Sequence, residues 1–352
     1  MLISLQFSTY NDPKLVCFRF WKQLCSLHSV TSSSFSLFQL IFVFYISLKM
    51  TIMENSKYNS IVEDFRQLRQ TIKAVDIQDV LDALFEKYSK EGYEEKLILS
   101  LIMYVHQSDT RAKVGKVDWA KAYDDYKNGK GTILEIAKEL DISPTIVAKR
   151  FLLNISDKLT VKQWLQDTNE IPNGELAVQV MMAQYADPIF GQLSHCVMRN
   201  AGELFEYEVA QILKKAQISY ASENSLRTKE FDVTPDFKLN IPIEIVLSSD
   251  NTKAYILPPV KLPLCQLCST DEFSRSRIFI SWIECKALFA SGHCHKDYLK
   301  YQFNSYANRF GRGLILYKYG CTRSVMKRDP KLIIAEELVY HECANQLANL
   351  RL

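Results

Sequence analysis

Thr234-Pro235-Asp236-Phe237 and Trp282-Ile283-Glu284-Cys285-Lys286 are the two stretches that decide the fold of this chain. Side chains alternate along a β-strand, so Glu284 and Lys286 share one face while Cys285, between them, points to the other. A hairpin brings Asp236 beside this pair. Two carboxylates provide hard oxygen ligands for Mg²⁺, which proteins hold through one or two carboxylates, waters and substrate phosphates. The two stretches therefore predict strands that meet at a metal site.

Taken alone, this pattern also fits a charged β-hairpin at the surface. A polar stripe downstream favours the site. Its members are spaced three, four, four and three residues apart, which places them on one side of a helix: His295, Tyr298, Gln302, Tyr306 and Arg309. The neighbouring stripe of Leu299, Phe303 and Ala307 is apolar and predicts the side that faces the core. A helix that displays hydrogen-bond donors beside its buried stripe fits the binding of an anion.

A second amphipathic helix is predicted upstream, over residues 203–215. Glu206 on this helix is a candidate third acid for the metal or its water shell. Glu203 and Glu208 are rival candidates, and a solvated charge on the helix surface is the alternative interpretation.

The predicted order is a helix with a glutamate, a Pro-Asp strand, a Glu-x-Lys strand and a helix with Gln302 and Tyr306. This order resembles the PD-(D/E)XK nuclease superfamily, and the Gln302/Tyr306 pair resembles its RecB-like branch. Longer stretches are similar, in the right order, to the codanin-1-interacting nuclease family: Ser225-Leu226-Arg227-Thr228-Lys229, Thr234-Pro235-Asp236-Phe237, Trp282-Ile283-Glu284-Cys285-Lys286-Ala287 and Arg309-Phe310-Gly311-Arg312-Gly313-Leu314. The resemblance covers most of the chain from about Ser56 onward.

The resemblance implies an α/β fold, with a restriction-endonuclease-like mixed sheet flanked by helices and preceded by an all-α domain. It also implies hydrolysis of phosphodiester bonds in DNA or RNA with Mg²⁺ or Mn²⁺. The implied catalytic residues are Asp236, Glu284, Lys286 and Glu206. The implied metal ligands are Asp236, Glu284 and the backbone carbonyl of Cys285, and Lys286 would position the water and offset charge on the phosphate. The implied substrate contacts are Gln302, Tyr306, Arg309 and His295.

The same resemblance implies a codanin-1-like protein as a partner and a location in the nucleus and cytoplasm. An alternative function is an adaptor that has the nuclease fold and binds codanin-1 without catalysis. The presence of Asp236, Glu284 and Lys286 together favours chemistry, because an inactive site has no physical reason to hold two carboxylates beside a lysine.

The pattern divides the chain into an extension (1–52), a helical domain (53–168) and a nuclease-like domain (169–352). Within the helical domain, residues 132–153 have the spacing of a helix-turn-helix. Asp141 stands in the turn where glycine is usual, and Ser143 is placed to cap the second helix.

Two interpretations of this segment stay open. In a nucleic-acid-binding regulator, Thr145, Lys149 and Arg150 would lie against the phosphate backbone. Otherwise the segment is an αα-hairpin in a small bundle.

Two further stretches depart from the family pattern. Residues 1–52 include an apolar run (35–48) that is shorter than the roughly 18 residues of a membrane-spanning helix, so we expect an extension and no membrane partner. The alternative is a signal peptide or anchor, since basic residues precede the apolar run. An insertion at about 246–275 replaces a short hairpin connection. Its Cys265 and Cys268 have zinc-ligand spacing, with His293, Cys294 and His295 downstream, and the alternative is that the cysteines are free thiols.

The composition is average for an intracellular globular protein, with 47% hydrophobic and 24% charged residues. The formal net charge of +3 is too small to indicate nucleic-acid binding by itself, so phosphate contacts would depend on local basic patches. The nine cysteines are expected to be thiols in a reducing compartment.

Overall fold

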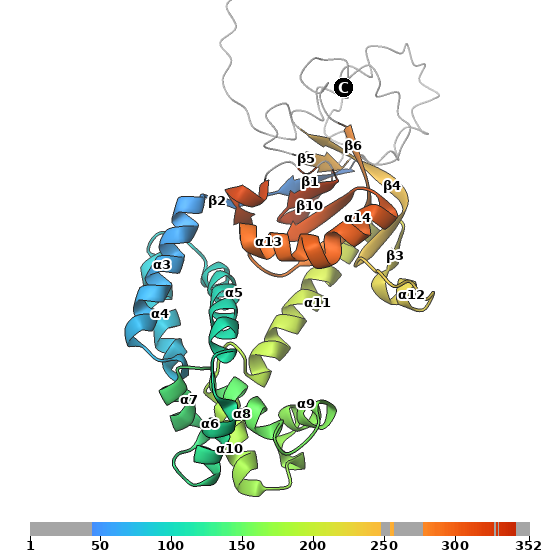
Figure 1. The fold of residues 1–352 in the computed structure, drawn as a ribbon. Helices are drawn as coiled ribbons and strands as arrows, with labels where there is room; N and C mark the ends of the chain where they lie inside the picture. Colours follow the sequence, from blue (N-terminus) through green and yellow to red (C-terminus); the bar gives the residue numbers. More distant parts are fainter. Residues whose placement is uncertain (1–43, 248–253, 257–276, 327–328, 330, 343–352) are drawn as a thin grey trace, which may run out of the picture.

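The computed structural model describes residues 44–247, 254–256, 277–326, 329 and 331–342. A bundle of helices forms its N-terminal part, and a sheet with helices packed against it forms its C-terminal part (Figure 1). The long helix α11 runs from the bundle to the sheet. No helix among these residues has the length and apolarity needed to cross a bilayer. The mixture of helices and sheet agrees with the predicted α/β class.

The helices up to the first long strand are α3 (Asn55–Thr71), α4 (Ile77–Ser89), α5 (Glu95–Val114), α6 (Trp119–Lys127), α7 (Ile133–Leu140), α8 (Pro144–Leu152), α9 (Lys158–Gln166), α10 (Gly174–Tyr185), α11 (Gln192–Lys215) and α12 (Glu223–Arg227). Short 3₁₀ turns, η2 (Ala74–Asp76) and η3 (Thr168–Glu170), precede α4 and follow α9. One core joins α3, α4 and α5, and a second joins α6 to α10.

The segment 132–153 forms the predicted pair of helices, α7 and α8. Asp141 adopts a left-handed conformation (φ 51°) at the end of α7, where glycine is favoured. Its carboxylate receives hydrogen bonds from Arg69 Nη2 at 2.7 Å and from the backbone N–H of Ala74 at 2.8 Å, and it also pairs with Lys113. These contacts stabilise a backbone conformation that is costly for a residue with a Cβ atom.

The N-terminal residues of α8 are buried against α10, which distinguishes α8 from the exposed recognition helix of a nucleic-acid-binding protein. Thr145 is 8% exposed, and its hydroxyl donates to the carbonyl of Ala183 in α10. The predicted cap by the Ser143 side chain was wrong: this hydroxyl donates to Asp187, whose carboxylate also accepts from the N–H of Thr145. Since a recognition helix reads bases with its N-terminal residues, this arrangement favours the αα-hairpin.

The helical core extends past residue 168, where we placed the domain boundary. Leu176, Val180 and Ala183 of α10 pack in the same cluster as α7 and α8. The extent of the helical core thus depends on contacts in the folded chain, and the sequence pattern of the helices does not reveal it.

The strands are β1 (Phe44–Lys49), β2 (Ile52–Met53), β3 (Tyr220–Ser222), β4 (Phe237–Leu247), β5 (Ala254–Ile256), β6 (Arg277–Lys286), β7 (Gly313–Tyr317), β8 (Cys321–Thr322), β9 (Leu332–Ala335) and β10 (Glu337–Glu342). The main sheet has the order β10-β1-β5-β4-β6-β7-β9, with β3 beside β4. The β6–β7 and β7–β9 pairs are parallel and the others antiparallel, so the sheet is mixed as expected.

The sheet curls so that its two ends come together. Strands β9 and β10 lie at opposite ends of the strand order, yet only Glu336 separates them in the chain. Because successive Cα atoms are about 3.8 Å apart, the two ends of the order must be close in space.

Two strands come from stretches that we had set apart from the domain. Residues 44–49 of the expected extension form β1, which lies between β10 and β5. Residues 254–256 of the expected insertion form β5, which pairs with β1 and β4. A chain that began at Met53 would therefore lack a strand from the interior of this sheet.

Helices cover both faces of the strands that carry the candidate site. On one face, Phe205, Val209 and Leu213 of α11 pack with the core that includes Ile283 and Cys285 of β6. The other face packs against α13 (Gly292–Tyr298), the π-helix η5 (Leu299–Phe303) and α14 (Asn304–Phe310). The short 3₁₀ helix η6 (Arg323–Met326) follows β8.

Gly313 allows Trp282 to lie flat in this second core. The two residues are paired on neighbouring strands, and a Cβ atom at position 313 would lie 2.0 Å from the Trp282 ring. Trp282 also donates from Nε1 to the carbonyl of Gly311 at 2.9 Å and packs edge-on against Tyr306, with ring centroids 5.3 Å apart.

We expect Gly313→Ala to lower the free energy of unfolding by about 2–3 kcal/mol, because the added methyl group must displace the indole ring. Gly202→Ala is the matched control, since its Cβ would meet nothing within 4 Å. That change should raise stability by up to about 1 kcal/mol through helix propensity. Urea unfolding of both variants tests this, and equal effects would contradict the packing of Trp282.

Candidate active site

Asp236 and Glu284 are brought together by the antiparallel pairing of β4 and β6, in which Phe237 lies opposite Ile283. Asp236 Oδ2 accepts a hydrogen bond from the backbone N–H of Cys285 at 2.7 Å. In return, the backbone N–H of Asp236 donates to Glu284 Oε2 at 3.3 Å. Each carboxylate is therefore held by the backbone of the strand that carries the other.

Lys286 completes the pair on the same face of β6. Its Nζ lies 2.7 Å from Glu284 Oε1, and the two side chains are only 18% and 2% exposed. The ammonium also sits 5.1 Å from the centre of the Tyr298 ring. Cys285 is buried in the core on the opposite face. The alternation predicted for Glu284, Cys285 and Lys286 is confirmed.

Gln302 and Tyr306 brace Glu284 from the helical side. Gln302 Nε2 donates to Glu284 Oε1 at 2.8 Å and to the Tyr306 hydroxyl at 2.7 Å. That hydroxyl donates to the carbonyl of Thr234 at 3.0 Å. These hydrogen bonds thus connect the backbone just before Asp236, through Tyr306 and Gln302, to Glu284. Gln302 lies in the π-helix η5, a kind of turn that occurs often at functional sites.

Of the three candidate glutamates on the upstream helix, Glu203, Glu206 and Glu208, it is Glu206 that lies near this cluster. Burial, together with repulsion from Asp236 and Glu223, raises the pKa of Glu206 to about 7. Glu208 instead pairs with Lys318 at 2.9 Å, and Glu203 is exposed.

His295 and Arg309 lie outside the cluster. His295 is 7% exposed, with Nδ1 2.8 Å from the hydroxyl of Tyr317, and burial lowers its pKa to about 4. Arg309 is exposed, and its guanidinium lies 4.9 Å from the Phe231 ring. The single stripe that we predicted needs regular helical spacing, which the π-helix interrupts. The apolar stripe did form, because Phe303 and Ala307 are buried and Leu299 packs beside them.

The electrostatics of the cluster favour an added cation. Burial raises the pKa of Asp236, and burial together with repulsion from Asp236 raises the pKa of Glu284. Burial opposes the charge of Lys286, but Glu284 and Asp236 raise its pKa above the usual range. With Glu206, three carboxyl groups share one ammonium, so full ionisation leaves an excess of negative charge.

The donor set suits a hard divalent cation. The side chains of Glu206, Asp236 and Glu284 offer only oxygen, which Mg²⁺ and Mn²⁺ accept. The N–H and C=O of one strand residue point to the same side, so the Cys285 carbonyl also faces the side of Asp236. Among the described residues, no group of three His, Cys, Asp or Glu side chains is already set at metal-binding geometry. A bound ion would therefore draw the carboxylates closer.

The zinc alternative has no described site. Cys265 and Cys268 lie outside the described residues. Cys294 is buried like His295, and burial raises the pKa of the Cys294 thiol to about 12.

Glu223, the first residue of α12, is a further acidic residue beside Asp236 that was not predicted from the sequence. Its backbone N–H donates to the carbonyl of Asp236 at 3.2 Å, and its carboxylate accepts from Thr234 Oγ1 at 3.3 Å. Its charge contributes to the raised pKa of Glu206. In the sequence Glu223 follows Ser222 at an ordinary helix start, so no local signal distinguishes it.

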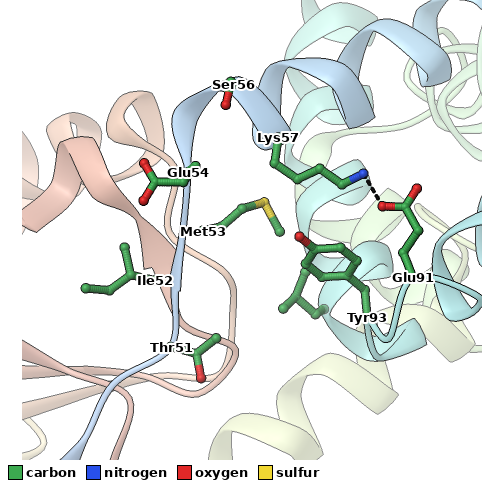
Figure 2. A pocket seen from close by; sticks show the side chains of 9 residues that line it. Thr51, Ile52, Met53, Glu54, Ser56, Lys57, Glu91 and Tyr93 are labelled. Atoms are coloured by element: carbon green, nitrogen blue, oxygen red, sulfur yellow. Dashed lines mark hydrogen bonds and ion pairs between the residues drawn. The ribbon is translucent and has the colours of Figure 1, made fainter.

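A cleft of about 440 Å³ lies elsewhere, where the chain passes from β2 into α3 (Figure 2). Lys57 and Glu91 form an ion pair beside it, with Tyr93 and Met53 nearby. None of its lining residues belongs to the acidic cluster.

Comparison with known proteins gives one family profile and several relatives. A profile described as "Protein of unknown function TPD sequence-motif" matches residues 172–249 and 261–338. Three relatives are each named "CDAN1-interacting nuclease 1". The Mus musculus protein is 32% identical over 212 residues, which cover 56% of this chain and 65% of the relative. The Bos taurus and Homo sapiens proteins are each 30% identical over 241 residues, covering 63% of this chain and 75% of each relative. The match to the Mus musculus protein thus spans just under two thirds of its length. No solved structure matches the chain significantly.

Glu206 should make the metal-free protein less stable as pH rises. The unfolded carboxyl loses its proton near the ordinary value of 4.5, while the folded one keeps it to about 7. Between these values the unfolded state binds fewer protons, so unfolding becomes easier with increasing pH. Glu206→Gln removes this loss, and we expect the variant to be more stable than the parent by about 1–2 kcal/mol at pH 8, after allowance for partial exposure.

The measurement is urea unfolding in EDTA from pH 5 to pH 8, taken as the difference between variant and parent so that other groups cancel. Glu203→Gln, at an exposed position of the same helix, removes only a minor contribution to the raised pKa of Glu206, so it should change the pH dependence much less than Glu206→Gln. Parallel pH profiles for parent and Glu206→Gln would contradict the placement of Glu206.

Proposed function

The chain belongs to the CDAN1-interacting nuclease 1 family, and on that premise we propose that it is a metal-dependent nuclease of the PD-(D/E)XK type. The observation that carries the proposal is the buried cluster in which Asp236, Glu284 and Lys286 hold one another through the paired ends of β4 and β6. Burial of three ionisable groups in one place is costly for stability and is typical of catalytic sites. The reaction proposed is hydrolysis of a phosphodiester bond in DNA or RNA.

Asp236, Glu284 and the carbonyl of Cys285 would hold Mg²⁺ or Mn²⁺, with Glu206 contributing to the ion or its water shell. Such an ion polarises phosphate oxygens and lowers the pKa of water when it is bound. Gln302 fixes the orientation of Glu284, and Tyr306 fixes Gln302. Glu284 is therefore held in one orientation before substrate arrives.

Lys286 supplies the cation of the site. Its pKa is raised by Glu284 and Asp236, so the ammonium keeps its protons at neutral pH. In that state it donates to Glu284 and offers further N–H groups to an attacking water or a phosphate oxygen. The face of the Tyr298 ring holds the ammonium from the other side. We assign it to orienting water and offsetting charge rather than to abstracting a proton.

A codanin-1-like protein is the proposed partner, because the relatives carry this interaction in their name. The proposed location is the nucleus and cytoplasm. The second candidate function is an adaptor that binds this partner without catalysis. The nuclease is favoured because the buried cluster has the groups needed for chemistry.

We expect the full-length chain to cleave at least one member of a labelled panel of single-stranded, duplex and branched DNA and RNA. Cleavage should need Mg²⁺ or Mn²⁺ and stop in EDTA. Asp236→Asn and Lys286→Ala should each lower the rate by on the order of 100-fold or more, because each removes charge from the reacting centre. Glu208→Gln, which removes the ion pair between Glu208 and Lys318 and leaves the acidic cluster intact, should retain the parent rate.

Metal-independent cleavage, or full activity of Lys286→Ala, would contradict this mechanism. If the folded parent chain cleaves none of these substrates, with and without the partner, the adaptor becomes the better function.

Partner binding should not depend on the catalytic side chains. Glu284 is 2% exposed and Asp236 is held by β6, so neither offers a surface to another protein. We expect the Asp236→Asn, Lys286→Ala double variant to bind a purified codanin-1-like protein with a Kd within about twofold of the parent, measured by calorimetry. A loss of tenfold or more would show that the partner contacts this site, and would contradict separate roles.

A further inference from the structure

A polar stripe extends along α11 from the acidic cluster toward the helical bundle. At about 100° per residue, Gly202, Arg199 and His195 lie within about 40° of the direction of Glu206 around the helix axis. The negative charge of Asp236 contributes to the raised pKa of Glu206, which places the Glu206 side chain beside the cluster. The stripe therefore continues the side of α11 that meets the acidic cluster.

The surface of this stripe is open in the described part of the chain. Arg199 and His195 are exposed, and a Cβ atom added at Gly202 would meet nothing within 4 Å. Figure 1 shows this part of α11 between the bundle and the sheet. A strand of nucleic acid that enters the acidic cluster thus has room to follow the helix past Gly202.

Arg199 is the arginine of this stripe, and its donors are available. Among the described residues its guanidinium contacts Cys196, with Nη2 3.9 Å from Sγ, and it forms no ion pair, although Glu203 lies one turn away. The planar guanidinium presents N–H groups whose geometry matches the oxygens of a phosphate. Arg199 can therefore bind a phosphate without first breaking an ion pair.

The spacing between Arg199 and Glu206 fits a phosphate backbone. The two residues are seven positions apart, which corresponds to about 10 Å along the helix axis. One strand of B-form DNA advances about 3.4 Å per nucleotide, so this distance equals about three nucleotides. Phosphates beyond the one that is cleaved need a cation of their own, because the excess negative charge of the acidic cluster repels them.

We propose that Arg199 binds the phosphate backbone of the substrate about three nucleotides from the bond that is cleaved, with His195 as a second donor one turn further along α11. This role depends on the nuclease function proposed above and adds a substrate contact to it. Because phosphates are the same in every sequence, the contact adds affinity without base specificity. It acts equally on the bound substrate and on the transition state, and therefore lowers KM without raising kcat.

Binding of nucleic acid by the full-length Asp236→Asn chain tests this contact, since that change should leave the nucleic acid intact. The probe is the most tightly bound member of the labelled DNA and RNA panel. Arg199→Gln should raise the Kd by about three- to tenfold at about 0.1 M salt. The slope of log K against log salt should shrink by about 0.7 to 0.9, the effect of one lost phosphate contact. Arg199→Lys keeps the charge and should retain the parent slope.

Lys215→Gln is the matched control. Lys215 is an exposed cation of the same helix, but it lies nine residues from Glu206 and therefore on the opposite side of α11. This variant removes the same charge and should keep the parent Kd and salt slope. In the active chain, Arg199→Gln should raise KM by the same factor as the Kd and leave kcat within about twofold.

Equal losses in Arg199→Gln and Lys215→Gln, or a parent salt slope in Arg199→Gln, would overturn the contact, while cleavage by the parent chain would still support the nuclease. Weaker binding of the codanin-1-like protein by Arg199→Gln, with nucleic-acid binding unchanged, would assign the residue to that partner and also overturn the contact. A chain that neither binds nor cleaves any member of the panel overturns both proposals. Binding that depends on Arg199 in a chain without cleavage would support the contact and overturn the nuclease.

Discussion

The reciprocal hydrogen bonds between Asp236 and the strand of Glu284 are the contact on which the rest of the site depends. The Cys285 N–H holds one carboxylate, and the Asp236 N–H holds the other. These bonds require that β4 and β6 pair in one register, with Phe237 opposite Ile283. A slip of one residue would turn Glu284 and Lys286 into the face that holds Cys285. The apolar cores on the two faces oppose such a slip, because they bury Ile283 and Trp282 on opposite sides.

Burial gives this cluster its chemical character and also its cost. Glu284 is almost completely covered, and among the described residues Lys286 is the cation that pairs with it against three nearby carboxyl groups. Burial and mutual repulsion raise the pKa values of these acids, which favours their protonated forms when no metal ion is bound. The proposed divalent ion would displace those protons, so its binding would be coupled to proton release. The helical network of Gln302 and Tyr306 keeps Glu284 in place in either state.

Helix α11 connects the two parts of the molecule through its inward side. Met198 contacts the helical bundle, Phe205 and Val209 contact the sheet, and Glu206 approaches the acidic cluster. Its outward side exposes Leu193, Val197, Leu204 and Tyr207.

The sequence by itself determined the strand bearing Glu284 and Lys286 and the helical segment with Gln302 and Tyr306, because these follow from local periodicity. The class of fold was implied by the resemblance to a known family. The similarity of the chain to relatives determined the family. Only the tertiary structure distinguished Glu206 from Glu203 and Glu208, since these residues share a helix and differ in what packs against them. Likewise, His295 and Arg309 fit the predicted stripe, but the π-helix and the sheet placed them elsewhere. Residues 44–49 and 254–256 have no local signal of membership in the sheet, because strands are stabilised by partners that are distant in the chain.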